Sequence, residues 1–213
     1  SAFVALLLIT FIGSIEPGIP PRHAWHAVES EHVLLITKSM LQYAQDHQGK
    51  YPSGKSSTEV FQKLLDGGYA GYFKIPASLF YFPIKGKTPA IDGQPLKPEN
   101  VCFDITGLAD SSDSADLPLV FSTGFKVSYE PGASAKRLAP LEFRLPGFEL
   151  FRPDPGPSHN CIVIGYKRPE VRTLFVEEDT TPNGAALGFI PPNFNANSKT
   201  YRQLTPNGPL PDN

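Results

Sequence analysis

Three aspartates lie in one short polar segment of the chain: Asp110, Asp113 and Asp116. Carboxylate oxygens are the hard ligands that calcium prefers, so these residues are the candidates for a calcium site. The segment lacks the Asp-x-Asp-x-Asp-Gly spacing of a calcium-binding loop, so we expect a solvated acidic turn, with a calcium site as the alternative. We therefore expect no cofactor, with calcium at this loop as the alternative.

Two further groupings contain residues that take part in metal or nucleophile chemistry. His23 and His26 lie one turn apart on an expected helix, but the sequence offers no third zinc ligand, so we expect an exposed pair. Ser158 and His159 precede Cys161, yet no orienting partner is identifiable, and a turn entering a strand is expected. The chain also lacks hydrolase, zinc-protease and phosphate-loop motifs, so we expect that it is not an enzyme.

The chain has two cysteines, and each lies in an apolar run typical of a strand. If the two strands are neighbours, a disulfide between Cys102 and Cys161 is geometrically feasible and would suit an exported protein. The alternative is two separate buried thiols. Their spacing fits no metal or redox motif.

Residues 24–52 predict a long helix with a sharp end. Apolar and aromatic residues recur at spacings of three and four, which places them on one buried stripe. Gly49 can adopt the left-handed conformation that closes a helix, and Pro52 prevents continuation. The expected stripe consists of Trp25, Val28, His32, Leu35, Ile36, Met40 and Tyr43.

A second helix, residues 56–65, begins with a Ser56 and Glu59 capping box. Short β-like runs follow, and residues 161–166 and 171–177 are separated by a hairpin-length turn. The predicted fold class is α+β: a long N-terminal helix packed on a small antiparallel β-sheet, with an apolar N-terminal arm and an extended, proline-rich C-terminal tail. The other expected strands are residues 79–82, 101–106, 119–123 and 125–129.

The composition fits one domain with appendages: 213 residues, of which 40% are hydrophobic and 19% charged. We divide it into an apolar arm with a proline-rich break (1–21), an α+β domain (22–179) and an extended tail (180–213). The net charge of −2 provides no basic field, so nucleic acid is not an expected partner.

Residues 2–15 are uncharged and apolar, and would span only about 21 Å as a helix, against about 30 Å for a bilayer core. It could be the apolar part of a signal peptide, a weak anchor, or a helix buried by packing against copies of itself, and we expect the last. In the tail, large apolar groups also need cover, and we expect them to clasp a neighbouring subunit. The predicted assembly residues are Phe3, Leu6, Leu7, Leu8, Ile9, Phe11, Ile12, Phe189, Phe194 and Tyr201.

The order of motifs after the first helix resembles that of the type IV pilin-like and type II secretion pseudopilin-like proteins, the family with a prepilin-type N-terminus. The resemblance covers roughly residues 24–180, whereas Ser1 and Ala5 depart from the aromatic residue and glutamate typical of that family. It implies processing just before the apolar segment and assembly into filaments. The segments that carry it are Tyr43–Pro52, the capped helix at 56–65, Gly67–Tyr69, Ser78–Pro83 and Asn100–Asp104.

The function expected from these features is that of a structural subunit of an extracellular pilus-like or pseudopilus-like filament, assembled as a homopolymer through its hydrophobic N-terminus. Such a subunit is exported and associates with the inner membrane, and with secretion or pilus assembly machinery, before it assembles at the cell surface. The alternative is a membrane-anchored envelope module that binds a ligand as a monomer.

Overall fold

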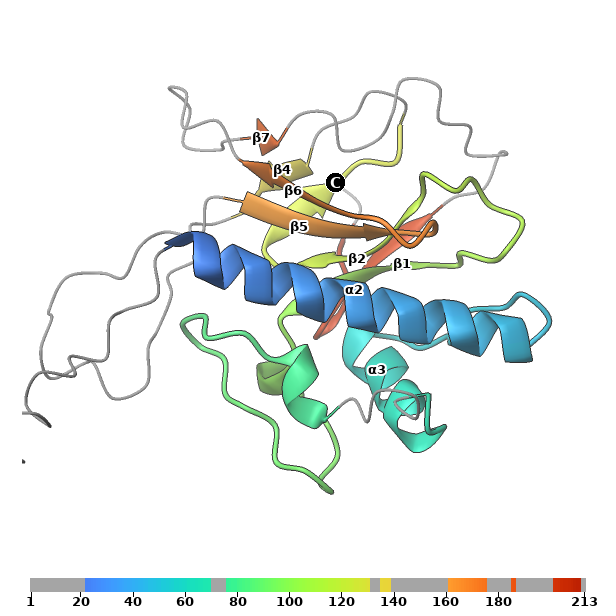
Figure 1. The fold of residues 1–213 in the computed structure, drawn as a ribbon, viewed down its shortest axis with the longest axis horizontal. Helices are drawn as coiled ribbons and strands as arrows, with labels where there is room; N and C mark the ends of the chain where they lie inside the picture. The colour runs from blue at the N-terminus through green and yellow to red at the C-terminus, as the bar shows by residue number, and fades with distance from the viewer. Residues whose placement is uncertain are drawn as a thin grey trace, which may run out of the picture.

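The computed structural model describes residues 22–69, 76–130, 135–138, 161–175, 185–186 and 201–211. Helix α2 runs along the main sheet, and α3 lies beside the C-terminal half of α2 (Figure 1). Helix α2 contacts β5, β2 and β6, whereas α3 contacts β1 and β8, so the two helices cover neighbouring parts of the sheet. The helices are α2 (Arg22–Asp46) and α3 (Ser57–Asp66), with 3-10 turns η1 (Ala77–Phe80) and η2 (Pro98–Asn100).

The strands form two antiparallel sheets. The larger has six strands in the order β6-β5-β2-β1-β8-β9, and the smaller has three in the order β3-β4-β7. The predicted fold class, a long helix packed on a small sheet, is therefore wrong, because the described chain is rich in strands. The strands are β1 (Phe103–Gly107), β2 (Pro118–Ser122), β3 (Phe125–Val127), β4 (Ala135–Arg137), β5 (Cys161–Tyr166), β6 (Val171–Phe175), β7 (Ala185–Ala186), β8 (Arg202–Thr205) and β9 (Gly208–Pro209).

The predicted extended C-terminal tail is also wrong for its described part. Strand β8 pairs with β1, Ile105 opposite Leu204, and then turns back through β9. Of the tail's described prolines, Pro206 lies in the turn and Pro209 lies on the edge strand β9, where no ladder hydrogen bond from the proline nitrogen is needed. Residues 202–204, which pair with β1, contain no proline.

The central strands β1, β2 and β5 are buried along their whole length. Both faces of the main sheet must therefore be covered there, which fits the apolar run of β5, whereas β1 alternates apolar residues with the buried Asp104 and Thr106. The expected hairpin of residues 161–166 and 171–177 is present as β5 and β6. Residues 79–82, expected as a strand, instead begin within η1.

The end of helix α2 follows the sequence prediction, whereas its buried face follows it only in part, at Ile36 and Met40. Gly49 has a φ of +82° and its N–H donates to the Ala44 carbonyl at 2.7 Å, closing the helix. The buried stripe is rotated from the predicted one, and Val28 is 41% exposed. Because two of its members are polar, the hydrophobic pattern alone misplaced it; the stripe consists of Glu29, Val33, Ile36, Thr37, Met40 and Ala44.

A buried carboxylate lies where the two sheets meet. Gln203 Nε2 donates to Asp104 Oδ2 at 2.7 Å and to the Phe125 carbonyl at 2.6 Å, and Gln203 Oε1 accepts from the Val127 N–H at 3.0 Å. One side chain on β8 therefore joins β1 to β3. Burial raises the pKa of the Asp104 carboxyl to about 7, although the hydrogen bond from Gln203 opposes the shift.

The pKa of Asp104 predicts a pH-dependent stability. Between the unfolded value of about 3.9 and the folded value, the folded state holds the extra proton, so the free energy of unfolding falls as pH rises. We expect the protein to lose on the order of 2 to 4 kcal/mol between pH 4 and pH 8 from this group. Asp104→Asn should remove that loss in urea unfolding followed by circular dichroism.

The control is Asp66→Asn, which changes an exposed carboxylate on α3. It should leave the pH dependence as in the unmodified chain. Equal pH slopes for the unmodified protein and Asp104→Asn would contradict the assignment.

Candidate functional site

Three side chains with different ligand chemistry converge where α2 begins to cross the sheet: His26, Glu29 and Cys161. His26 and Glu29 are three residues apart on α2 and so share one face of the helix. Cys161 is the first residue of β5, the strand that α2 lies against. One imidazole nitrogen, one carboxylate oxygen and the thiol sulfur all lie within 4.8 Å of one another.

The carboxylate and the thiol of this cluster are held by the core. Cys161 Sγ lies 3.0 Å from His26 Nδ1 and 3.9 Å from His26 Nε2. Ser122 Oγ on β2 donates to Glu29 Oε1 at 2.7 Å, and it accepts from the Val163 N–H at 2.9 Å. Ser122 thus connects the carboxylate on the helix to the backbone of β5.

Burial differs within the cluster. Glu29 is 1% exposed and Cys161 is 0% exposed, whereas His26 is partly exposed. The His26 ring meets the Phe175 ring edge-on, at 5.7 Å between centroids and 88° between planes. Burial raises the pKa of the Cys161 thiol, and the nearby Glu29 carboxylate raises it further. The sulfur is thus a thiol at neutral pH unless a cation displaces its proton.

Thiolate, imidazole and carboxylate are the three ligand types that zinc takes from proteins. The expectation that His26 has no further metal-ligating neighbours is therefore wrong, because Glu29 and Cys161 lie beside it. The i, i+3 spacing of His26 and Glu29 was visible in the sequence. Cys161 was not, because it follows 135 residues after His26 and only the packing of α2 on β5 brings it near.

The other candidate residues that the sequence offered near this cluster add no further ligand or nucleophile. The side chain of His23 lies outside what the structure describes, as do Ser158 and His159. Cys161 itself is fully buried, which does not suit a nucleophile that must meet a substrate.

The aspartate loop is held together by protein groups. Asp113 is 4% exposed; its Oδ2 accepts from the Asp110 N–H at 2.6 Å and its Oδ1 accepts from Tyr201 at 2.8 Å. Lys167 Nζ donates to the carbonyls of Ser111 and Asp113. An ammonium group thus already supplies positive charge to the loop that contains the calcium candidates.

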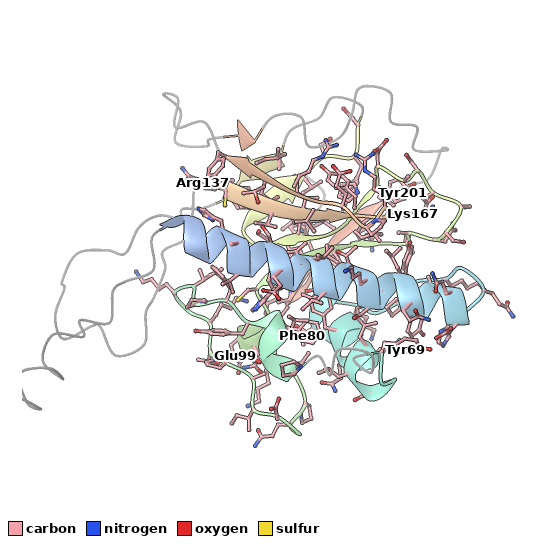
Figure 2. All side chains as sticks on the ribbon, in the orientation of Figure 1. Tyr69, Phe80, Glu99, Arg137, Lys167 and Tyr201 are labelled. Carbon is pink, nitrogen blue, oxygen red and sulfur yellow. The ribbon has the colours of Figure 1, made fainter. Side chains whose placement is uncertain are left out.

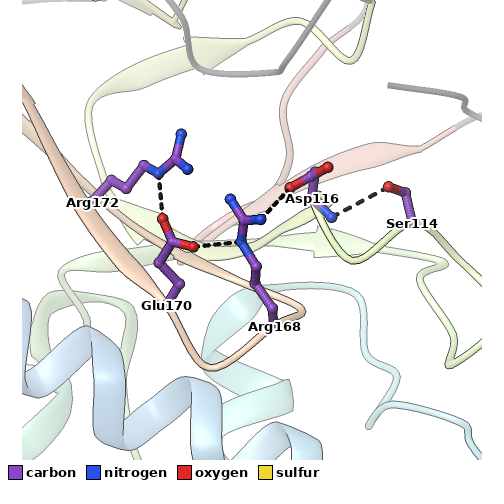
Figure 3. A network of polar contacts seen from close by, with 5 residues as sticks. All are labelled: Ser114, Asp116, Arg168, Glu170 and Arg172. Carbon is purple, nitrogen blue, oxygen red and sulfur yellow. Dashed lines mark hydrogen bonds and ion pairs between the residues drawn. The ribbon is translucent and has the colours of Figure 1, made fainter. Parts of the chain in front are cut away.

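Asp116 belongs to a separate surface network. Its Oδ1 lies 3.0 Å from Arg168 Nη1, and Glu170 bridges Arg168 and Arg172 at 2.6 Å and 2.5 Å (Figure 3). The side-chain hydrogen bond from Arg172 lowers the pKa of the Glu170 carboxyl. Asp110, Asp113 and Asp116 therefore face different partners, and within the described ranges they do not form a group whose ligand atoms could share one ion.

Both cysteines are free thiols in the structure. Cys102 Sγ donates to the Phe82 carbonyl at 3.2 Å, whereas Cys161 Sγ contacts His26. The disulfide that the sequence made feasible is not formed, because the two sulfurs have different neighbours.

Most of the expected assembly residues cannot be compared with the structure. Residues 1–21 and the segment containing Phe189 and Phe194 lie outside the described residues. Tyr201 is described, and it is 8% exposed and bound to Asp113 within the same chain. Figure 2 shows Tyr201 and Lys167 at the same end of the molecule, where both meet the aspartate loop.

We predict that Tyr201→Phe destabilises the fold without changing its packing volume. Burial and Asp113 raise the pKa of the Tyr201 hydroxyl, so it stays a neutral donor to a buried carboxylate. Removing it should cost about 1 to 3 kcal/mol in urea unfolding. Tyr69→Phe is the matched control, because its hydroxyl bonds to the exposed residues Asp46 and His47 and should contribute little. Equal midpoints for the two variants would contradict an internal role for Tyr201.

The chain was compared with family models, curated proteins and solved structures, and nothing matches in any of the three comparisons. Of the helices in the part of the chain that the structure describes, none combines the length and apolarity needed to cross a bilayer. Its function has therefore to be inferred from its own residues and their geometry.

Proposed function

We propose that this chain is a structural subunit of an extracellular pilus-like or pseudopilus-like filament, assembled as a homopolymer through its apolar N-terminal residues. The observation that carries the proposal is the uncharged run at residues 2–15, which precedes helix α2 by only a few residues. Packing that run against copies of itself would remove apolar surface from water, at roughly 25 cal/mol per Å².

The attachment of helix α2 supports this proposal. Val33 and Ile36 are 0% exposed and Met40 is 1% exposed, so the helix is built into the core of the domain along much of its length. A load applied at the start of α2 would therefore be borne by the core and the sheet. A subunit of a filament needs such a connection between its contact segment and its folded domain.

Exposed apolar side chains near the start of α2 also support it. Val28 is 41% exposed, and Phe175, whose ring meets His26, is 60% exposed. Val28 lies in the N-terminal half of α2, and Phe175 lies on β6, which contacts that half of the helix. Contact between copies at this end of the domain would cover them together with residues 2–15.

The order of motifs between residues 43 and 104 is the remaining support, through its resemblance to pseudopilin-like proteins. Under this proposal the protein is exported and its partners are copies of itself. It associates with the membrane and with secretion or pilus assembly machinery before assembly.

The test is a charge placed inside the apolar run. Leu8→Glu should abolish fibres in negative-stain images and shift the sedimenting species to monomers, because a carboxylate buried between copies is costly. The circular dichroism spectrum of the domain should stay unchanged. Gln45→Glu, which adds the same charge at an exposed site on α2, should leave assembly as it was.

Removing residues 1–15 should have the same effect as Leu8→Glu. Fibres formed by the truncated chain would show that residues 2–15 do not drive assembly. A monodisperse full-length monomer that needs detergent and forms no fibres would instead favour a membrane-anchored module that acts alone.

A further inference from the structure

We infer that His26, Glu29 and Cys161 form a binding site for a divalent transition-metal ion of the zinc class, which fixes the first turns of α2 to strand β5. The site is independent of the filament proposal, because it depends only on described residues of the folded domain. Three protein ligands would leave a fourth tetrahedral position for water or an external ligand.

The choice of metal follows from the ligand types. A thiolate and an imidazole are soft and intermediate ligands, which select zinc or a similar transition metal over calcium and magnesium. The aspartate loop differs from this cluster, because its candidate ligand atoms are all oxygens and because Lys167 Nζ already donates to two of its carbonyls. The metal expected at the start of α2 is therefore different from the one that the sequence suggested.

The distances fit a tetrahedral centre with small adjustments. Zinc binds sulfur at about 2.3 Å and nitrogen or oxygen at about 2.0 to 2.2 Å, so its ligand atoms stand roughly 3 to 4 Å apart. Cys161 Sγ and His26 Nδ1 are 3.0 Å apart, and the three ligand atoms lie within 4.8 Å of one another. Rotation of the partly exposed His26 side chain can supply the remaining adjustment.

The surrounding structure orients the ligands, as in established metal sites. Ser122 donates to Glu29 Oε1 at 2.7 Å, which orients the carboxylate beside His26 and Cys161. Cys161 is held by the backbone pairing of β5 with β6, opposite Phe175. Helix α2 and strand β5 thus supply the three ligands, and β2 supplies Ser122, so no loop is needed to form the site.

The charges of the complex also balance. Binding exchanges the thiol proton of Cys161 for the metal ion, and the proton passes to solvent. One thiolate and one carboxylate then compensate the two positive charges of the ion, and a neutral imidazole completes the set. Because the complex is neutral, it leaves no uncompensated charge at this buried position, where Glu29 is only 1% exposed.

Cobalt(II) is the probe, added to the full-length chain in mild detergent. We expect one ion per chain, with visible bands of tetrahedral cobalt and a near-ultraviolet thiolate-to-cobalt charge-transfer band. One equivalent of zinc should remove both. Cys161→Ser should lose the charge-transfer band, whereas the matched control Cys102→Ser, which changes the other buried thiol, should keep it.

Two further variants test the rest of the site. Ser122→Ala should weaken cobalt binding about 10-fold to 100-fold, the usual effect of removing a residue that orients a metal ligand. Glu29→Gln retains an oxygen that can accept from Ser122 but removes the charge, and should weaken binding at least as much.

His26→Ala tests the site without disturbing the core, because His26 is the partly exposed member. Zinc should raise the melting temperature of the unmodified chain and have no such effect on this variant. The inference is overturned if the unmodified chain gives no charge-transfer band, if Cys161→Ser keeps the band, or if His26→Ala binds cobalt as tightly as the unmodified chain.

Discussion

Helix α2 lies so close to strand β5 that the strand has no room for a side chain at the crossing point. A Cβ atom on Gly165 would stand 2.1 Å from Thr37 Oγ1 and 2.9 Å from Val33 Cγ1. Such distances are far below van der Waals contact, so glycine is required there for steric reasons. This close approach brings His26 to Cys161 at the other end of β5, and it attaches helix α2 to the sheet.

The crossing also explains which buried groups the helix can tolerate. Thr37 is 0% exposed, and its hydroxyl has no hydrogen-bond partner among the described residues. Glu29 is equally deep but accepts from Ser122. A buried polar group without a partner costs stability, whereas one with a hydrogen-bond partner, the usual case in folded proteins, avoids that cost. Thr37 and Glu29 lie on the same buried stripe of α2, but within the described part of the chain only Glu29 has a side-chain hydrogen bond to the sheet.

The sequence predicts local structure where a chemical signal is local. The end of α2 at Gly49, the Ser56 cap of α3 and the hairpin of β5 and β6 depend on residues within a few positions of one another, and all three are present. The size of the sheet was missed because β8 pairs with β1, which lies about a hundred residues earlier in the chain. Strand β8 contains no proline, but Pro206 and Pro209 follow it so closely that its sequence resembles an irregular segment.

The candidate site was missed for the same reason. His26 and Glu29 follow a helical spacing that the sequence displays, but Cys161 joins them only through the fold. The aspartate loop shows the reverse error, because its three carboxylates are close in sequence and yet Asp113 and Asp116 bind different partners, Tyr201 and Arg168. Proximity in sequence is weak support for a shared ligand, whereas convergence of rigid elements is stronger.

The most direct test of this account is a double-mutant cycle at the crossing of α2 and β5. Gly165→Ala should lower the free energy of unfolding by about 1 to 3 kcal/mol or more through overpacking. Thr37→Ala, which removes the nearest obstructing atom and an unpaired buried hydroxyl, should be neutral or stabilising alone and should recover much of that loss in combination. Gly165→Ala as stable as the unmodified chain in urea, or a loss that Thr37→Ala does not reduce, would contradict the close packing of α2 on β5.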